Sequence, residues 1–162
     1  MNRRQTMRLL SLLGLGAKAT TTAAATAAAP APTVLRLSEA DWKQRLSPAA
    51  FRVLRQAGTE PPGSSALNAE KRKGVFHCAG CDLALFSSDA KYESGTGWPS
   101  FHTPLPGALG TKTDFKLILP RTEYHCARCT GHQGHVFDDG PRPSGKRYCN
   151  NGVALAFVPA AA

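Results

Sequence analysis

Two matched segments, FHCAGC at residues 76–81 and YHCARC at residues 124–129, decide how this chain folds. Each contains a C-x2-C pair, and four thiols at this paired spacing suit one tetrahedral zinc ion. Because 44 residues separate Cys81 from Cys126, the ion would join two remote turns and stabilise the fold by about 10 kcal/mol. We therefore predict one structural zinc ion. Its ligands are Cys78, Cys81, Cys126 and Cys129.

Two other interpretations of the C-x2-C pairs stay open. The pairs can be redox-active dithiols, or they can form two disulfides, which an exported location would favour. A C-x2-C disulfide closes a very tight loop, however, and small residues inside duplicated pairs are typical of zinc sites. His77 and His125, each directly before a cysteine, are interpreted as strand residues rather than ligands.

The segments around the cysteine pairs have the pattern of short strands separated by turns rich in Gly, Pro and Asp. No βαβ alternation is present, so the residues predict an antiparallel β domain clipped by zinc. The expected strands are residues 75–77, 83–86, 115–119, 123–125, 135–137 and 147–157.

Two short helices are expected before the first strand, at residues 38–46 and 47–58. Each begins with a serine N-cap, the first has an acid three residues later as in a capping box, and Gly58 is expected to end the second. Residues 59–74 are interpreted as a surface loop, and its basic run at 71–73 as a solvated one.

Residues 1–31 are expected to be an export signal with its cleavage region. They contain four basic residues, no acid, and a short apolar run before an Ala/Thr tract. The pair Arg3-Arg4 favours a twin-arginine signal and the bacterial periplasm, and a mitochondrial presequence is the alternative. A disordered tail is a third interpretation. No run reaches about 20 apolar residues, so no stable membrane insertion is expected.

The net charge gives weak support for nucleic-acid binding. Four of the twenty Lys and Arg residues lie in the leader, which leaves sixteen against eleven Asp and Glu residues. Four thiolates on a divalent zinc would remove two further charges. We therefore expect no nucleic-acid partner.

Cys149, the fifth cysteine, has no C-x2-C partner and is the candidate nucleophile. If residues 147–157 formed one strand, Arg147, Cys149 and Asn151 would share one face at the mouth of a site, with three apolar residues anchoring that face in the core. A thiol with a pKa near 8.5 is only about 3% ionised at pH 7. Positive charge from Arg147 is therefore expected to activate it.

A general acid or base can come from His132 and His135 in the segment GHQGHVF, residues 131–137. In a regular strand a spacing of three places them on opposite faces, but a bulge at Gly134 would turn both the same way. A His-x-x-His pattern alone is often unrelated to catalysis. Its presence together with Cys149 favours a catalytic role.

At this point the chain resembles the methionine sulfoxide reductase B family in the order and spacing of several motifs. The match runs from about Leu37 to Phe157. The matching segments are CxxC at 78–81, GTGWPSF at 95–101, CxxC at 126–129, GHQGHVFDDGP at 131–141 and RYCxN at 147–151.

The resemblance implies a mainly β fold class, with two antiparallel sheets, short N-terminal helices and a structural zinc site made of four cysteines. The domain itself would cover residues 37–158. A short linker at 32–36 would precede it, and residues 159–162 would form a C-terminal tail. No organic cofactor is implied.

The activity implied is that of a peptide-methionine (R)-S-oxide reductase acting on oxidised proteins or peptides. Cys149 would attack the sulfoxide sulfur and end as a sulfenic acid while the methionine side chain departs. His132 and His135 would assist protonation of the sulfoxide oxygen, and Asn151 and Arg147 would hold the polar site together.

Trp98 matches the family's aromatic residue that receives the substrate methyl group. A sulfoxide carries one polar oxygen and one apolar methyl, so stereoselection needs donors on one side and an aromatic wall on the other. Trp98-Pro99 can also be a rigid packed turn. Phe101 and Phe137 are candidates to complete the wall, or else belong to the core.

Three departures from the family pattern change the expectations. Thr96 stands where many members carry a resolving cysteine, so the sulfenic acid is expected to meet a thioredoxin-like or other external thiol directly. Gln133 replaces the usual Leu between the histidines. Asn150 and Gly152 stand beside the catalytic positions, where apolar and small hydroxyl residues are usual.

Two other function classes stay open. A secreted zinc-ribbon binding module could grip an anionic partner with the basic loop at 71–73, and it would not need Cys149, Asn151 or Trp98. A thiol-disulfide oxidoreductase using a C-x2-C pair would show redox activity without tightly held metal.

Overall fold

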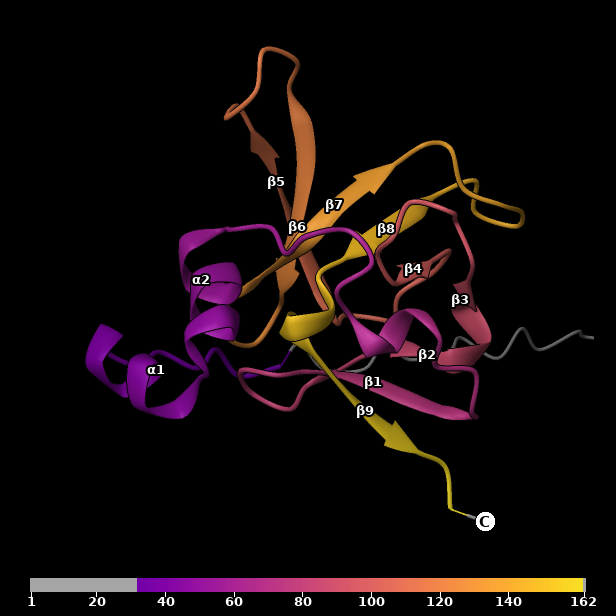
Figure 1. Cartoon of the computed structure of the whole chain (residues 1–162). Helices are drawn as coiled ribbons and strands as arrows, with labels where there is room; N and C mark the ends of the chain where they lie inside the picture. The colour runs from indigo at the N-terminus through magenta and orange to yellow at the C-terminus, as the bar shows by residue number, and fades with distance from the viewer. Residues whose placement is uncertain (1–31, 162) are drawn as a thin grey trace, which may run out of the picture.

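Two antiparallel sheets, preceded by two short helices, make up the computed structural model, which describes residues 32–161 (Figure 1). The predicted fold class, mainly β with two antiparallel sheets, is confirmed. The predicted export signal at 1–31 lies outside the described residues. Within the described part of the chain, no helix has the length and apolar character needed to cross a membrane.

The two helices begin as their capping residues predict. Helix α1 (Glu39–Arg45) has both hydrogen bonds of a capping box between Ser38 and Asp41. Helix α2 (Pro48–Gln56) ends at Ala57, which adopts the left-handed φ of 49° one residue before the predicted stop. The apolar face of α2 packs on the end of the larger sheet that carries the candidate site.

The smaller sheet has the strand order β2-β1-β9, and the larger has the order β3-β4-β8-β7-β6-β5. The smaller sheet consists of β1 (Gly74–Cys78), β2 (Ala84–Ser87) and β9 (Leu155–Pro159). The larger consists of β3 (Lys91–Tyr92), β4 (Ser100–Phe101), β5 (Leu109–Asp114), β6 (Arg121–Cys126), β7 (His132–Phe137) and β8 (Arg147–Asn150). Short 3-10 turns lie at Ala66–Asn68 (η1), Ser88–Ala90 (η2) and Gly152–Ala154 (η3).

An aromatic cluster joins the two sheets in the core. Phe76 and Phe86 come from the smaller sheet, and Phe101 and Tyr124 from the larger, and none of the four is exposed to solvent. The rings of Phe86 and Phe101 stack at 4.2 Å, while Phe76 meets Phe101 edge-on at 4.9 Å. Burial of this aromatic area holds the two sheets together.

The predicted single strand at residues 147–157 is wrong, because η3 separates β8 from β9. The buried Glu60 carboxylate accepts hydrogen bonds from the backbone N–H groups of Gly152 and Val153. These bonds turn the chain out of the larger sheet and into the smaller one. The expected alternation therefore stops at Asn150, and no single face runs from Arg147 to Phe157.

The predicted strand at residues 115–119 is also wrong. The strand in this region, β5, lies upstream and ends at Asp114, whose side chain accepts a hydrogen bond from the backbone N–H of Lys116 at 2.9 Å. An aspartate that bonds the backbone two residues ahead favours a turn over a strand. Residues 115–119 therefore form the tip of the hairpin between β5 and β6.

The loop at residues 59–74 is only partly a surface loop. Its basic run at 71–73 is exposed as predicted, whereas Glu60 is 7% exposed. Gly63 N and Asn68 Nδ2 both donate hydrogen bonds to the carbonyl oxygen of Gly97, at 2.7 and 3.0 Å. The loop is thereby fastened over the segment that carries Trp98.

Candidate active site and metal centre

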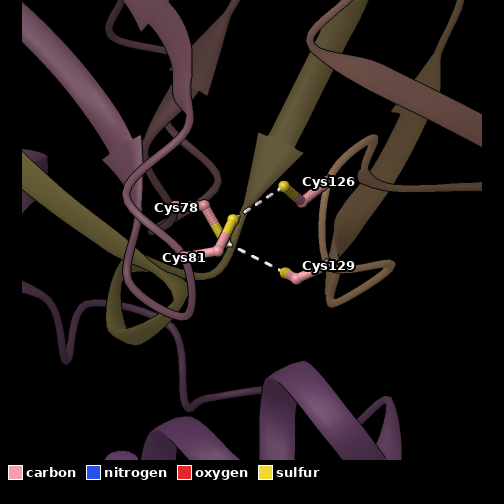
Figure 2. A group of neighbouring side chains, drawn as sticks. All are labelled: Cys78, Cys81, Cys126 and Cys129. Atoms are coloured by element: carbon pink, nitrogen blue, oxygen red, sulfur yellow. Dashed lines mark hydrogen bonds between the residues drawn. The ribbon is translucent and has the colours of Figure 1, made fainter. Parts of the chain in front are cut away.

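The four paired cysteines converge between the end of β1 and the end of β6 (Figure 2). All four are buried, and their Sγ atoms lie within 4.8 Å of one another. The Sγ atoms of Cys78 and Cys129 are 3.6 Å apart, and those of Cys81 and Cys126 are 3.4 Å apart. Four sulfurs held about 2.3 Å from one zinc in a tetrahedron would be about 3.8 Å apart.

The two cysteine turns close in the same way. Asp82 N donates to the carbonyl oxygen of Cys78 at 2.8 Å, and Thr130 N donates to that of Cys126 at 2.9 Å. Asp82 and Thr130 adopt left-handed φ values of 62° and 57°. Each C-x2-C pair is thus prearranged so that both of its thiols point to one place, and the four residues could hold a metal ion. All four thiols are free, so the alternative of two disulfides is not what the structure contains.

A cavity of about 130 Å³ lies at the centre of the larger sheet and contains Cys149. Register explains why: on β8, Cys149 is paired with His135 of β7 on one side and with Ser100 of β4 on the other. The cavity is lined by Thr59, Trp98, Arg121, Gly134, His135, Phe137, Cys149, Asn150 and Asn151. The structure therefore brings together five predicted site residues, namely Trp98, His135, Phe137, Cys149 and Asn151.

The predicted bulge in β7 is confirmed. Tyr124 of β6 pairs with Gly134 while His125 pairs with His132, so Gln133 is the extra residue. The rings of His132 and His135 consequently lie side by side with their centroids 5.4 Å apart. Gly134 is required here, because a β-carbon would lie 1.9 Å from the backbone oxygen of Cys149.

His135 is held by a buried carboxylate that sequence reasoning missed. Its Nε2 lies 2.7 Å from Asp114 Oδ2, which also accepts a hydrogen bond from Arg121 at 2.8 Å. Hydrogen bonds from the Lys116 backbone, His135 and Arg121 hold the pKa of the Asp114 carboxyl well below its usual range. Asp114 is therefore ionised near neutral pH and orients the His135 ring.

His132 lies behind His135 rather than in the cavity wall, and is 3% exposed. Its Nδ1 is 3.2 Å from Glu123 Oε1, too poorly aligned for a hydrogen bond, and neither ring nitrogen has another partner among residues 32–161. Burial lowers the pKa of His132, and the nearby Glu123 carboxylate opposes that shift. The neutral ring is thus the favoured form in this site.

The Cys149 thiol is half-buried, and burial raises its pKa above the ordinary value. The Arg147 charge and a hydrogen bond with Thr96 act in the opposite direction but do not prevail. Arg147 is shared with Asp139, to which it donates two hydrogen bonds of 2.8 Å, and its guanidinium lies 4.4 Å from the centroid of the Phe137 ring. Arg147 thus lowers the pKa of the thiol, the direction expected from the sequence, but burial outweighs it.

Glu60 positions the other wall of the cavity and was also missed. Its backbone oxygen accepts a hydrogen bond from Trp98 Nε1 at 3.1 Å, and its backbone N–H donates to Asn151 Oδ1 at 2.9 Å. Asn151 Nδ2 in turn donates to the backbone oxygen of the bulge residue Gln133 at 2.9 Å. Asn151 therefore ties the cavity wall to the bulge in β7.

A buried polar chain connects the cavity floor to the cysteine cluster. Tyr124 Oη donates to Asn150 Oδ1 at 2.7 Å, and Asn150 Nδ2 donates to Gln133 Oε1 at 3.3 Å. Gln133 Nε2 then donates to Cys78 Sγ at 3.3 Å. Tyr124, Asn150 and Gln133 are all completely buried, so each group depends on the next for its hydrogen bonds.

Besides His132, two predicted site residues lie outside the cavity wall. Phe101 is completely buried in the aromatic core, and Arg147 lies beside the cavity without lining it. Glu60 and Asp114 carried no motif of their own. For Asp114 one sign was available, since an aspartate often closes an Asx turn at the end of a strand. That turn ends β5, which pairs with β6, and β6 pairs with β7, the strand that carries both histidines.

Comparison with known proteins gives one consistent family. Residues 46–159 match the SelR domain. The peptide methionine sulfoxide reductase MsrB of Leptospira interrogans is 50% identical over 121 residues, which cover 74% of this chain and 92% of that protein. The MsrB of Methanosarcina barkeri is 52% identical over 121 residues, covering 74% and 85% of the two chains, and that of Pseudomonas entomophila is 49% identical over 120 residues, covering 74% and 92%.

Proposed function

Because this chain belongs to the methionine sulfoxide reductase B family, it is a peptide-methionine (R)-S-oxide reductase, and we propose that Cys149 carries the oxygen away from the substrate. The observation that supports this most strongly is the cavity itself. One half-exposed thiol sits between an aromatic wall, Trp98 and Phe137, and polar groups from His135 and Asn151. An apolar methyl and a polar S–O group need these two kinds of wall.

In the proposed reaction the Cys149 sulfur attacks the sulfoxide sulfur, and the S–O bond to the substrate breaks. The oxygen and the thiol proton end on Cys149 as a sulfenic acid, and methionine leaves. Cysteine sulfur is thereby oxidised by two electrons and the substrate sulfur is reduced by two. Because the resting thiol has a raised pKa, the proton must reach the oxygen during the attack.

His135 is the residue we propose as the proton donor or relay. It lines the cavity, and the ionised Asp114, 2.7 Å from its Nε2, fixes its orientation. His132, buried and packed against His135, supports that ring from behind. Arg147 and Asn151 hold the surrounding polar groups rather than the reacting atoms.

The reductant proposed for the sulfenic acid is an external thiol, such as that of a thioredoxin-like protein. All five cysteines of the chain lie within the described residues, and four of them form the buried cluster. Thr96, which stands where many family members carry a resolving cysteine, offers no sulfur. Two external thiols would give water and a disulfide, and would restore the Cys149 thiol.

Zinc is the metal we propose for the cysteine cluster. Four cysteines with their Sγ atoms within 4.8 Å of one another are typical of a zinc site, and a zinc ion with four protein ligands is structural rather than catalytic. Bound there, the ion would join the turn after β1 to the turn after β6 and so hold the two sheets together. The reaction steps above do not involve it.

Export to the periplasm through a twin-arginine signal is a further part of the proposal, and it rests on the sequence of residues 1–31 alone. A protein that is moved folded would keep its metal and its reduced thiols during translocation. Replacing Arg3 and Arg4 by Lys should block export of the precursor in a bacterial host. Normal export of that variant would contradict this part of the account.

A single-turnover experiment tests the proposed chemistry. Reduced protein is mixed with excess methionine-(R)-sulfoxide without any thiol, in the presence of dimedone, which traps sulfenic acids. We expect about one methionine per protein and one dimedone adduct, located on Cys149 by mass spectrometry. Formation of a disulfide, seen as the loss of two thiols without an adduct, would contradict the external-thiol step.

A further inference from the structure

The tip of the β5–β6 hairpin, residues 115–119, exposes most of the large apolar side chains that face solvent in the described part of the chain. Figure 1 shows this hairpin projecting from the body of the molecule. Phe115, Leu117, Ile118 and Leu119 are 75, 57, 101 and 76% exposed. Exposed apolar residues gathered in one place mark a binding surface more often than scattered ones do.

An apolar hollow of about 730 Å³ lies between this tip and the end of β7. It adjoins the catalytic cavity, because Arg121 and Phe137 line both. Phe137 therefore forms the partition between the place where the sulfoxide reacts and the exposed apolar surface. The hollow is lined by Leu117, Ile118, Leu119, Pro120, Arg121, Thr122, Val136, Phe137 and Asp138.

The base of the tip is fastened to the catalytic machinery. Asp114, which holds His135, also accepts the hydrogen bonds from Lys116 N and Arg121 that close the turn. At the other side of the turn, Lys116 Nζ donates to the backbone oxygen of Ala57 at 3.1 Å. The apolar residues are thus presented at a fixed place beside the cavity, which lowers the entropy lost when a ligand binds.

We propose that this surface, residues 115–119 together with the hollow, binds apolar side chains that neighbour the oxidised methionine in an unfolded polypeptide. The proposal rests on the proposed function and specifies its substrate class. A polypeptide whose sulfoxide enters the 130 Å³ cavity brings its neighbouring residues close to the adjoining surface, and that surface is apolar. Apolar residues around a methionine are accessible in unfolded chains and buried in folded ones.

Two peptides that differ only in their flanks test the proposal. Both contain one central methionine-(R)-sulfoxide, one with leucine at several positions on each side and the other with serine at the same positions. The variant carries Ile118→Ser with Leu119→Ser. The control is Val158→Ser, since Val158 is also exposed, at 47%, but lies on β9 in the other sheet. Dithiothreitol is the reductant throughout.

We expect the tip variant to lose about ten-fold in kcat/KM on the leucine-flanked peptide, mostly through KM, because truncated apolar anchors typically cost that much. The serine-flanked peptide and free dabsyl-methionine-(R)-sulfoxide should be reduced as by the unaltered protein. The Val158→Ser protein should show the same ratio of kcat/KM on the two peptides as the unaltered protein.

Three outcomes would overturn the proposal. Equal losses on both peptides would make the tip a structural element. Unchanged kinetics on both peptides with dithiothreitol, with a loss of activity only when a thioredoxin-like protein is the reductant, would assign the surface to binding of the reductant. Unchanged kinetics with a concentration-dependent dimer that the variant abolishes would assign it to a second copy. Failure of the unaltered protein to reduce any (R)-sulfoxide would instead contradict the proposed function.

Discussion

The buried amide pair Gln133 and Asn150 makes the most specific prediction about stability. Gln133→Met and Asn150→Leu keep the side-chain sizes close to the original ones and remove the hydrogen-bonding groups. Asn150→Leu leaves two completely buried groups without partners, the Tyr124 hydroxyl and Gln133 Oε1. At about 1 to 3 kcal/mol for each unsatisfied group, we expect a loss of about 2 to 6 kcal/mol.

Gln133→Met should cost less. Asn150 Nδ2 keeps its second bond, to the backbone oxygen of Asn151 at 2.9 Å, so only one of its two N–H groups loses an acceptor, and the weak acceptor Cys78 Sγ loses a donor. We expect a loss of about 1 to 2 kcal/mol. In the double variant no Gln133 oxygen is left unsatisfied. Its loss in free energy of unfolding should therefore be smaller than the sum of the two single-variant losses by about 1 to 2 kcal/mol. Adding Tyr124→Phe should recover part of the remainder, because it removes the stranded hydroxyl.

The measurement is urea unfolding of the metal-loaded proteins, followed by fluorescence and by far-UV circular dichroism. Free energies of unfolding from the two single variants and the double variant form the cycle. Additivity within about 0.3 kcal/mol would show that the two amides do not depend on each other. That result would refute the interpretation of this buried polar chain as one connected unit.

Three further predictions concern the thiol, the bulge and the metal. Because burial raises the pKa of Cys149, the rate of its alkylation by iodoacetamide should rise about ten-fold per pH unit from about pH 6 to 9 without a plateau. Arg147→Gln should make alkylation slower, because it removes a charge that lowers this pKa. A plateau near pH 7 would contradict the raised pKa. Gly134→Ala should destabilise the protein by more than about 3 kcal/mol and abolish activity, since the alanine β-carbon would lie 1.9 Å from the Cys149 backbone oxygen. A variant that is stable by calorimetry and active in the assay would exclude this close approach of β7 to β8. Removal of the metal by a strong chelator, or Cys126→Ser, should unfold the domain at a urea concentration that the metal-loaded protein withstands, because metal binding supplies about 10 kcal/mol of folding free energy. Equal urea-unfolding midpoints with and without metal would show that the cluster is not structural.

The sequence predicted the parts of this fold that local chemistry determines. The serine caps fix the starts of α1 and α2, and the duplicated C-x2-C turns bring the four cysteines together. Gly134 predicted the bulge that turns the two histidines to the same side. In each cap, each C-x2-C turn and the bulge, the residues that decide the local structure are neighbours in sequence.

The sequence failed where a distant partner decides the structure. The run from Arg147 to Phe157 has the alternation of one strand, but Glu60 takes two of its backbone N–H groups and splits it. The pattern at 115–119 suits a strand, yet Asp114 caps the turn while holding His135 in another strand. A carboxylate in a loop gives no sign in the sequence of which remote backbone it will bind.

Reduction of the two sulfoxide stereoisomers tests the central claim most directly. The protein and its Cys149→Ser variant are assayed in parallel on dabsyl-methionine-(R)- and -(S)-sulfoxide with excess dithiothreitol. We expect turnover of the R form alone by the unaltered protein and none by the variant. Turnover of the S form at a similar rate, or undiminished turnover by Cys149→Ser, would contradict the assignment of this cavity and its thiol.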